Sequence, residues 1–321
     1  MAIAERRRQQ RLAEERTAKV TTSEGQKLHP VSRLKELWQF REILANLTRK
    51  EVKVKYTSSV LGAAWAMLNP LLFLLVFWFV FGLVLKNGLP QFPVYILSGI
   101  LAWNLYNSSL ALSARSVVDN ANLVKKVYFP REILPLSTIG VALVDFVFQA
   151  VVLVIFLLIE WHNPWGLNLV LLPLSIAALL LFVVALSFLV SALNVKYRDT
   201  QHLLNLALVM WFWLTPVVYP MATMQDRIVA SRHFGVPWLY AYLILNPMAT
   251  VLAGFQRAVY KVVTPVVHNP DGTTTTTRAL LDFSIAKQAV FLGIVCALSV
   301  GLILLTWRHF FRQSGDFAEE L

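Results

Sequence analysis

Six long apolar runs dominate this sequence of 321 residues. A helix needs about 20 predominantly apolar residues to cross the hydrocarbon core of a bilayer, and all six runs are near or above that length. The fifth run is the shortest, with 17 residues. We therefore predict an all-α polytopic membrane protein with six transmembrane helices, at about residues 62–85, 92–114, 133–159, 169–195, 203–219 and 285–307.

The basic residues are divided unequally between the two sides that these spans define. Lys and Arg resist translocation, so the side richer in them is cytoplasmic. Of the 29 Lys and Arg residues, all but seven lie on the side that carries both termini. We predict cytoplasmic termini, with the seven outer residues being Lys86, Arg227, Arg232, Arg257, Lys261, Arg278 and Lys287.

Composition excludes several other protein classes. Hydrophobic residues make up 57% and charged residues 15%, against roughly 45–50% and 25% in soluble domains. The net charge of +11 lies beside the membrane, where it fixes topology and meets anionic lipid, so we expect no nucleic-acid partner. The single cysteine, Cys296, excludes an intramolecular disulfide. The six histidines show no metal-ligand spacing, and no metal site is expected.

Two segments precede the first span. Residues 1–30 are basic and poor in large apolar residues, and we expect a disordered tail. Residues 31–60 are predicted to form an amphipathic helix at the cytoplasmic membrane interface, because apolar residues recur there every three or four positions. The helix is either a topology anchor or also a contact for a cytoplasmic partner. Its apolar face consists of Leu37, Phe40, Leu44 and Leu47.

The rest of the chain, residues 61–321, is the predicted transmembrane domain. Five motifs follow one another from residue 56 onward. They are the segment 56–82 with Asn69-Pro70, the segment 120–135, Lys196-Tyr-Arg-Asp199, Leu214-Thr-Pro-Val-Val-Tyr-Pro220 and Leu245-Asn-Pro-Met-Ala-Thr250. In this order they resemble the membrane subunits of ABC-2-type exporters of polysaccharides and teichoic acids. The resemblance covers residues 34–321 and implies short, re-entrant outer helices between spans five and six.

The resemblance implies a homodimeric channel driven by two copies of a separate cytoplasmic ATPase. ATP and Mg would bind to that partner, since this chain has no phosphate-loop motif; we expect no cofactor and no catalytic residue here. The implied cargo is a polyprenyl-diphosphate-linked glycan, such as an O-antigen, a teichoic acid or a cell-wall galactan. The implied location is the bacterial cytoplasmic membrane.

The segment 120–135 resembles the family's coupling element, which docks in a groove of the ATPase. Its aromatic pair is suited to filling a groove, and its charges to fixing the register. A plain topology loop would account for the lysines but not for the aromatic residues. The candidate coupling residues are Lys125, Lys126, Tyr128, Phe129, Arg131 and Glu132.

Three residues within the spans have two interpretations each. Asn69-Pro70 interrupts the helical hydrogen bonds of the first span, as a static kink or as a kink beside a transport path. Asp145 lies near the middle of the third span, where a carboxylate must face other helices or water. It is either a structural hydrogen-bonding group or part of a proton relay, and the absence of a second mid-span acid favours the structural role.

Two further residue sets are candidates for contact with the cargo. Aromatic faces bind the C–H faces of sugar rings, and the sugar-path candidates are Trp65, Phe77, Trp78, Trp103, Tyr106, Trp211 and Trp213. For any single one of them we favour packing against lipid, and for the group we expect that some line a sugar path. The candidates for diphosphate binding are Arg49, Lys50, Lys53 and Lys55, whose alternative partner is anionic lipid.

Two other functions stay in view. A drug or lipid exporter of the same superfamily would share the fold but not the specific motifs. A membrane-embedded sugar transferase would need clustered acids to hold a divalent cation and a diphosphate, and the sequence has no DD or DxD pair at the membrane.

Overall fold

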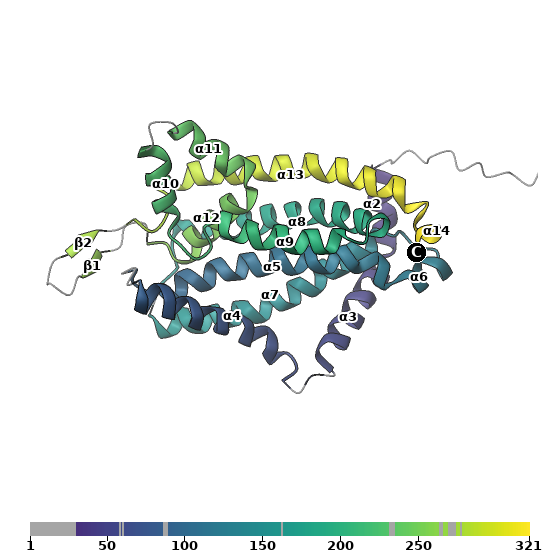
Figure 1. Ribbon diagram of the computed structural model, residues 1–321, viewed down its shortest axis with the longest axis horizontal. Helices are drawn as coiled ribbons and strands as arrows, with labels where there is room; N and C mark the ends of the chain where they lie inside the picture. Colours follow the sequence, from purple (N-terminus) through teal and green to yellow (C-terminus); the bar gives the residue numbers. More distant parts are fainter. Residues whose placement is uncertain are drawn as a thin grey trace, which may run out of the picture.

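The computed structural model describes residues 30–57, 59, 61–85, 89–161, 163–230, 235–262, 266–268, 274–276 and 278–321. These residues form a helical bundle and one small hairpin, which confirms the predicted α-helical fold class (Figure 1). The hairpin pairs β1 (Val266–His268) antiparallel with β2 (Thr274–Thr276), away from the bundle. Of the predicted basic tail, only Pro30 lies within the described residues.

Helix α5 (Phe92–Asp119) is the centre of the bundle, and 19 of its 28 residues are buried. It packs against α7 (Ile133–Ile159) and α8 (Leu171–Lys196), and α13 (Ile285–Ser314) covers α8. Figure 1 shows these four helices running along the long axis of the molecule. The remaining elements of the bundle are α4 (Ala64–Phe77), its π-helical extension η1 (Trp78–Val84), the short turn η2 (Leu167–Val170) and α9 (Thr200–Leu214).

Four helical segments of the described residues are long and apolar enough to cross a membrane: Ala64–Val84, Ile133–Ile159, Leu167–Lys196 and Ile285–Ser314. They coincide with the predicted spans one, three, four and six. Helix α5 is long enough, but several Asn and Ser residues reduce its hydropathy. Helix α9 has 15 residues and rises only about 22 Å. The predicted run 203–219 is wrong at its end, since the helix stops at Leu214 and Thr215 is extended.

The end of the molecule beside the hairpin, the hairpin end, is built from α10 (Met221–Ala230), α11 (Val236–Leu245) and α12 (Pro247–Val259). Helices α11 and α12 are bent by 98° at Asn246. The Asn246 side chain caps α12 by accepting a hydrogen bond from Ala249 N, and Pro247 begins the new helix. Its Oδ1 also accepts from Trp211 Nε1 at 2.8 Å. Asn246-Pro247 therefore forms a sharp corner between α11 and α12.

The opposite end, the α14 end, carries α2 (Pro30–Gln39), α3 (Arg41–Thr57), α6 (Ala121–Lys126), α14 (Phe317–Glu320) and the C-terminus. The predicted single helix over 31–60 is wrong, because α2 and α3 are separated at Phe40. Their predicted apolar face packs against a cluster of protein side chains that includes Phe129, Trp307 and Phe310. The apolar residues that stay exposed on α2 are Val31, Leu34 and Trp38.

Helix α3 lies against α7 at one close contact. A Cβ added to Gly140 of α7 would come within 2.8 Å of Thr48 Oγ1 and 2.9 Å of Thr48 Cγ2. Thr48 donates to the carbonyl oxygen of Ser137 at 3.2 Å, so the absent side chain allows a hydrogen bond between the helices. Gly62, with φ of +50°, follows α3 at the start of α4. These contacts bring the end of α3 to the middle of α7.

Candidate functional site

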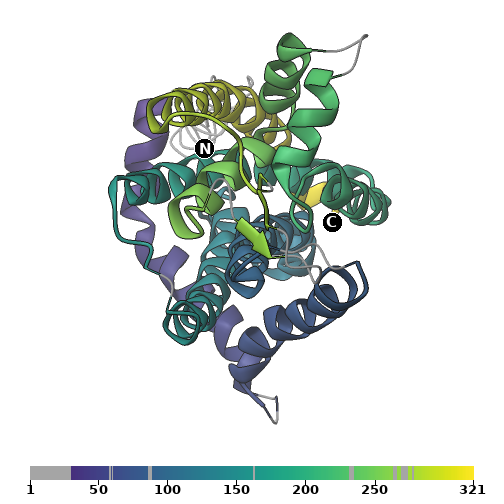
Figure 2. The same cartoon turned by 90° about the vertical axis from the view of Figure 1, so that its left-hand side faces the viewer.

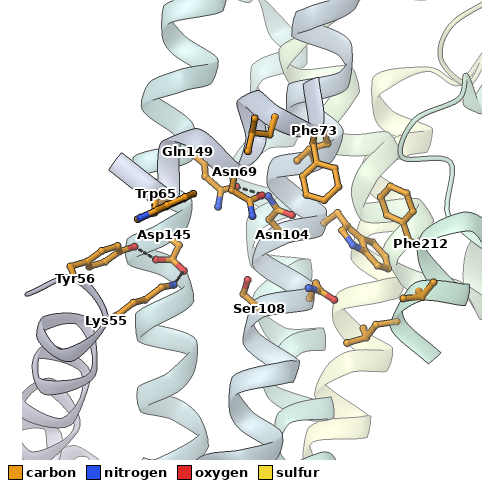
Figure 3. Close-up of a pocket in the computed structure, with 17 residues that line it drawn as sticks. Lys55, Tyr56, Trp65, Asn69, Phe73, Asn104, Ser108, Asp145, Gln149 and Phe212 are labelled. Carbon is orange, nitrogen blue, oxygen red and sulfur yellow. Dashed lines mark hydrogen bonds and ion pairs between the residues drawn. The ribbon is translucent and has the colours of Figure 1, made fainter. Parts of the chain in front are cut away.

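A pocket with a volume of about 610 Å³ lies where α3, α4, α5, α7 and α9 meet (Figure 3). Pockets of this volume accommodate small organic ligands. Figure 2, a view along the bundle, shows α4 at the edge of the molecule, so the pocket lies on one flank. The lining residues are Lys55, Tyr56, Trp65, Ala66, Asn69, Leu72, Phe73, Ile100, Trp103, Asn104, Asn107, Ser108, Asp145, Gln149, Leu208, Val209 and Phe212.

An ion pair forms one wall of this pocket. Asp145 is 6% exposed, and its Oδ2 lies 2.5 Å from Lys55 Nζ. The Tyr56 hydroxyl donates a hydrogen bond to the other carboxylate oxygen, as Figure 3 shows. Both oxygens of Asp145 are thus satisfied by α3, and no other acid of the described residues lines the pocket. This arrangement favours the structural interpretation of Asp145 over the proton relay.

Polar side chains line the pocket next to this pair. Asn104 Nδ2 donates to Gln149 Oε1 at 2.9 Å, which links α5 to α7. The side chains of Asn69, Asn107 and Ser108 have no hydrogen-bond partner within the described part of the chain. Amides at membrane depth are costly unless they are hydrogen-bonded or face a polar cavity. Asn107, Ser108 and the exposed Asn69 therefore give the pocket a polar lining that can hydrogen-bond a ligand.

Aromatic rings complete the lining, but only two of the seven predicted sugar-path residues are among them. Trp65 and Trp103 line the pocket. Phe77, Tyr106 and Trp211 pack within the aromatic core instead, and Trp78 and Trp213 lie on the outer surface of the bundle. The sequence interpretation missed Phe73 and Phe212. It also missed Asn104, Asn107 and Gln149, for which the available signal was polar amides inside apolar helices.

Pro70 does not end the first span, since α4 continues through it to Phe77. The neighbouring Asn69 lines the pocket. Asn69-Pro70 thus lies beside the pocket, and its role as a kink beside a transport path stays a prediction.

The candidate coupling residues separate into an exposed and a buried set. Lys125 and Lys126 are exposed at the end of α6, and Tyr128 is 83% exposed. Phe129 and Glu132 are buried, and Arg131 is half-buried, where desolvation lowers its pKa. Only the exposed set offers a surface to a partner in this conformation. The interpretation of Glu132 as a surface charge at the contact is wrong, because no part of its side chain is accessible.

Glu132 instead connects three separate elements at the α14 end. Its two carboxylate oxygens accept from Arg33 Nε and Nη2 of α2, each at 2.9 Å, and one also accepts from Trp307 Nε1 of α13 at 3.1 Å. Burial alone would lower the pKa of Arg33, but the hydrogen bonds that Arg33 donates to Glu132 and Glu36, together with the negative charges of these two residues, outweigh it and raise that pKa. We call this group the Glu132 hub (Glu132, Arg33, Trp307).

The four candidate diphosphate residues do not converge on one site. Arg49, Lys50 and Lys53 are exposed on α3, where Lys50 Nζ lies 3.1 Å from Glu51 Oε1, and Lys55 is paired with Asp145. Of these four residues, only Lys55 lines the pocket.

Comparison with known proteins identifies the family. The family model described as ABC-2 type transporter matches residues 43–260, which is most of the chain. The chain belongs to the ABC-2 type transporter family. This membership, together with the apolar helices, makes the chain a multi-pass membrane protein of the ABC-2 type.

The regions of several curated relatives that align with this chain make up most of each relative's length. The O-antigen export system permease protein RfbA of Myxococcus xanthus is 33% identical over 229 residues, 71% of this ABC-2 chain and 84% of that protein. A protein of the same name from Klebsiella pneumoniae is 30% identical over 220 residues, 67% of this chain and 79% of its own. The polysialic acid transport protein KpsM of Escherichia coli is 21% identical over 216 residues, covering 65% and 78%.

Proposed function

We propose that this chain is the membrane subunit of an ATP-driven exporter that moves a polyprenyl-diphosphate-linked polysaccharide out of the bacterial cytoplasm. Two relatives at 30% identity or more are O-antigen export permeases, which supports a polysaccharide cargo. The observation that carries the proposal is the pocket, because it combines amide groups and aromatic rings between helices that include the two apolar segments α4 and α7. Sugars are recognised by such combinations of hydrogen bonds and ring faces.

The proposed topology has six spans, with α5 and α9 added to the four apolar segments. Helix α5 does not need an apolar surface, because its neighbours shield most of it from lipid. The bent pair α11–α12 then forms a re-entrant element on the outer side, and both termini are cytoplasmic.

Two copies of the chain are proposed to form the complete path. Helices α4 and α9 flank the pocket and expose apolar side chains, among them Leu72, Phe73 and Val209. A second copy that packs on this flank would close the pocket into a channel and bury those side chains.

A separate ATPase is proposed to drive transport and to hold ATP and Mg. Its contact on this chain is the exposed set Lys125, Lys126 and Tyr128 at the α14 end. On α3, the exposed cations Arg49, Lys50 and Lys53 are proposed to attract the diphosphate of the lipid, with anionic lipid as the competing ligand.

The test is reconstitution of the chain with its ATPase in proteoliposomes. A polyprenyl diphosphate carrying an oligosaccharide should stimulate ATP hydrolysis and become accessible to an external glycosidase. A lipophilic drug panel serves as the comparison for the rival exporter class. Transport of drugs without any response to the glycolipid would contradict the proposal.

A further inference from the structure

The charge of the pocket restricts the glycan that it can hold. Among the residues that the structure describes around it, only Lys55 and Asp145 carry charge, and their charged atoms lie 2.5 Å apart. The charges of the two residues sum to zero. The Asp145 carboxylate is buried, while the Lys55 ammonium is partly accessible. The site therefore offers no spare cation to an anionic ligand.

The remaining polar lining is suited to hydroxyl groups. Each Asn side chain supplies two N–H donors and a carbonyl acceptor, and a sugar hydroxyl both donates and accepts. Asn69, Asn107 and Ser108 have these groups free within the described chain. The Trp65 ring, half exposed, lies beside Tyr56 and Asp145 in the same wall, as Figure 3 shows, and an exposed aromatic ring can stack on a sugar ring.

We propose that this pocket binds uncharged sugar units and disfavours anionic ones, because the Lys55–Asp145 pair holds its net charge at zero. The inference rests on the proposed function and narrows it. A neutral galactan or a neutral O-antigen fits this lining. A polymer with a phosphate or a carboxylate on every repeat would bring charges that the pocket leaves uncompensated and would place some of them near the Asp145 carboxylate.

The experiment compares two probes on the full complex in nanodiscs. One is a short polyprenyl diphosphate carrying four galactose units, and the other carries four galacturonic acid units. Lipid and diphosphate are identical, so the ratio of the two dissociation constants reports the sugar site alone. In the wild type the neutral probe should bind at least about tenfold more tightly, the factor that corresponds to about 1.4 kcal/mol. Equal binding, or tighter binding of the acidic probe, would overturn the inference.

Variants of the ion pair test the cause of the preference. Asp145→Asn leaves the Lys55 cation without its counter-ion and should shift the ratio about tenfold toward the acidic probe. The double variant Lys55→Met/Asp145→Asn restores zero charge and should restore the preference for the neutral probe. Lys35→Met, on the neighbouring helix α2 and exposed outside the pocket, is the matched control and should leave the ratio unchanged. An Asp145→Asn ratio equal to that of the wild type would contradict the proposed cause.

A variant that leaves the charge of the pocket unchanged provides a second test. This test stands even if the Asp145→Asn protein fails to insert into the membrane. Asn107→Leu should weaken the neutral probe several-fold and change the binding of the acidic probe less. An unchanged affinity for the neutral probe would overturn the inference. If neither probe binds and neither stimulates the ATPase, the proposed function itself fails; if both bind equally well, only the inference about charge fails.

Discussion

At the scale of single residues, the two partners of the pocket ion pair have different environments. Lys55 is 44% exposed and can turn toward water, whereas the Asp145 side chain is 8% exposed. Removing the lysine leaves a buried carboxylate uncompensated, which costs about 3–5 kcal/mol, while removing the acid leaves a cation that can be solvated. We therefore predict that Lys55→Met lowers the thermal unfolding midpoint of the detergent-solubilised protein more than Asp145→Asn does. Equal shifts would contradict this asymmetry.

The Glu132 hub gives a second prediction at this scale. Arg33 binds both carboxylate oxygens at 2.9 Å through two parallel N–H groups, a geometry that lysine cannot reproduce. Arg33→Lys should therefore destabilise the protein by about 1–3 kcal/mol although the charge is kept. The control is Lys35→Arg on the exposed side of α2, which should change stability little. Chemical denaturation of both variants in detergent measures the difference.

The sequence predicted part of this residue chemistry. It identified Asp145 as a group that must face other helices, because an apolar span makes a lone acid conspicuous. It could not identify Lys55 as its partner, because the two are 90 positions apart and only the packing of α3 on α7 brings them together. Similarly, the motif around Glu132 predicted a charged loop but not its burial, which depends on Arg33 and Trp307 from both ends of the chain.

At the scale of elements, the contact between α3 and α7 depends on the absence of a side chain at Gly140. Gly140→Ala would bring a methyl group within 2.8 Å of Thr48 and force the helices apart. Because this contact carries α3 to Asp145, the variant should weaken the Lys55–Asp145 pair and lower stability. The second change Thr48→Ala removes the clash and should recover much of the loss. Thermal unfolding of the single and double variants tests this; additive losses would exclude a steric cause.

Helix positions were predicted better than helix ends. Apolar length located α4, α7, α8 and α13, since lipid-facing and buried residues are both apolar in a membrane protein. It did not locate the end of α9 at Leu214 or the break at Phe40, where local side-chain packing decides. Helix α5 was predicted as a span by its run of apolar residues, yet its Asn and Ser residues contribute to the pocket.

At the scale of the whole molecule, the exposed and buried halves of the coupling segment should behave differently. Tyr128→Ala removes an 83% exposed ring and should weaken stimulation of the ATPase with little loss of stability. Phe129→Ala opens a cavity in the cluster at the α14 end and should cost about 3–5 kcal/mol of stability. Measurements of ATPase activity and of unfolding on both variants separate the roles. Unaltered ATPase stimulation with Tyr128→Ala would exclude this surface as the contact.

The Glu132 hub also bears on where this protein can be cut. The family match runs from residue 43 to residue 260 and contains Glu132 but neither Arg33 nor Trp307. A fragment trimmed to the matched region would keep a buried carboxylate and lose every side chain that the hub provides to neutralise or hydrogen-bond it. The unit that folds on its own therefore extends beyond the residues that the family model matches. Chimaeras between exporters should exchange α2 and the end of α13 together with the segment that contains Glu132.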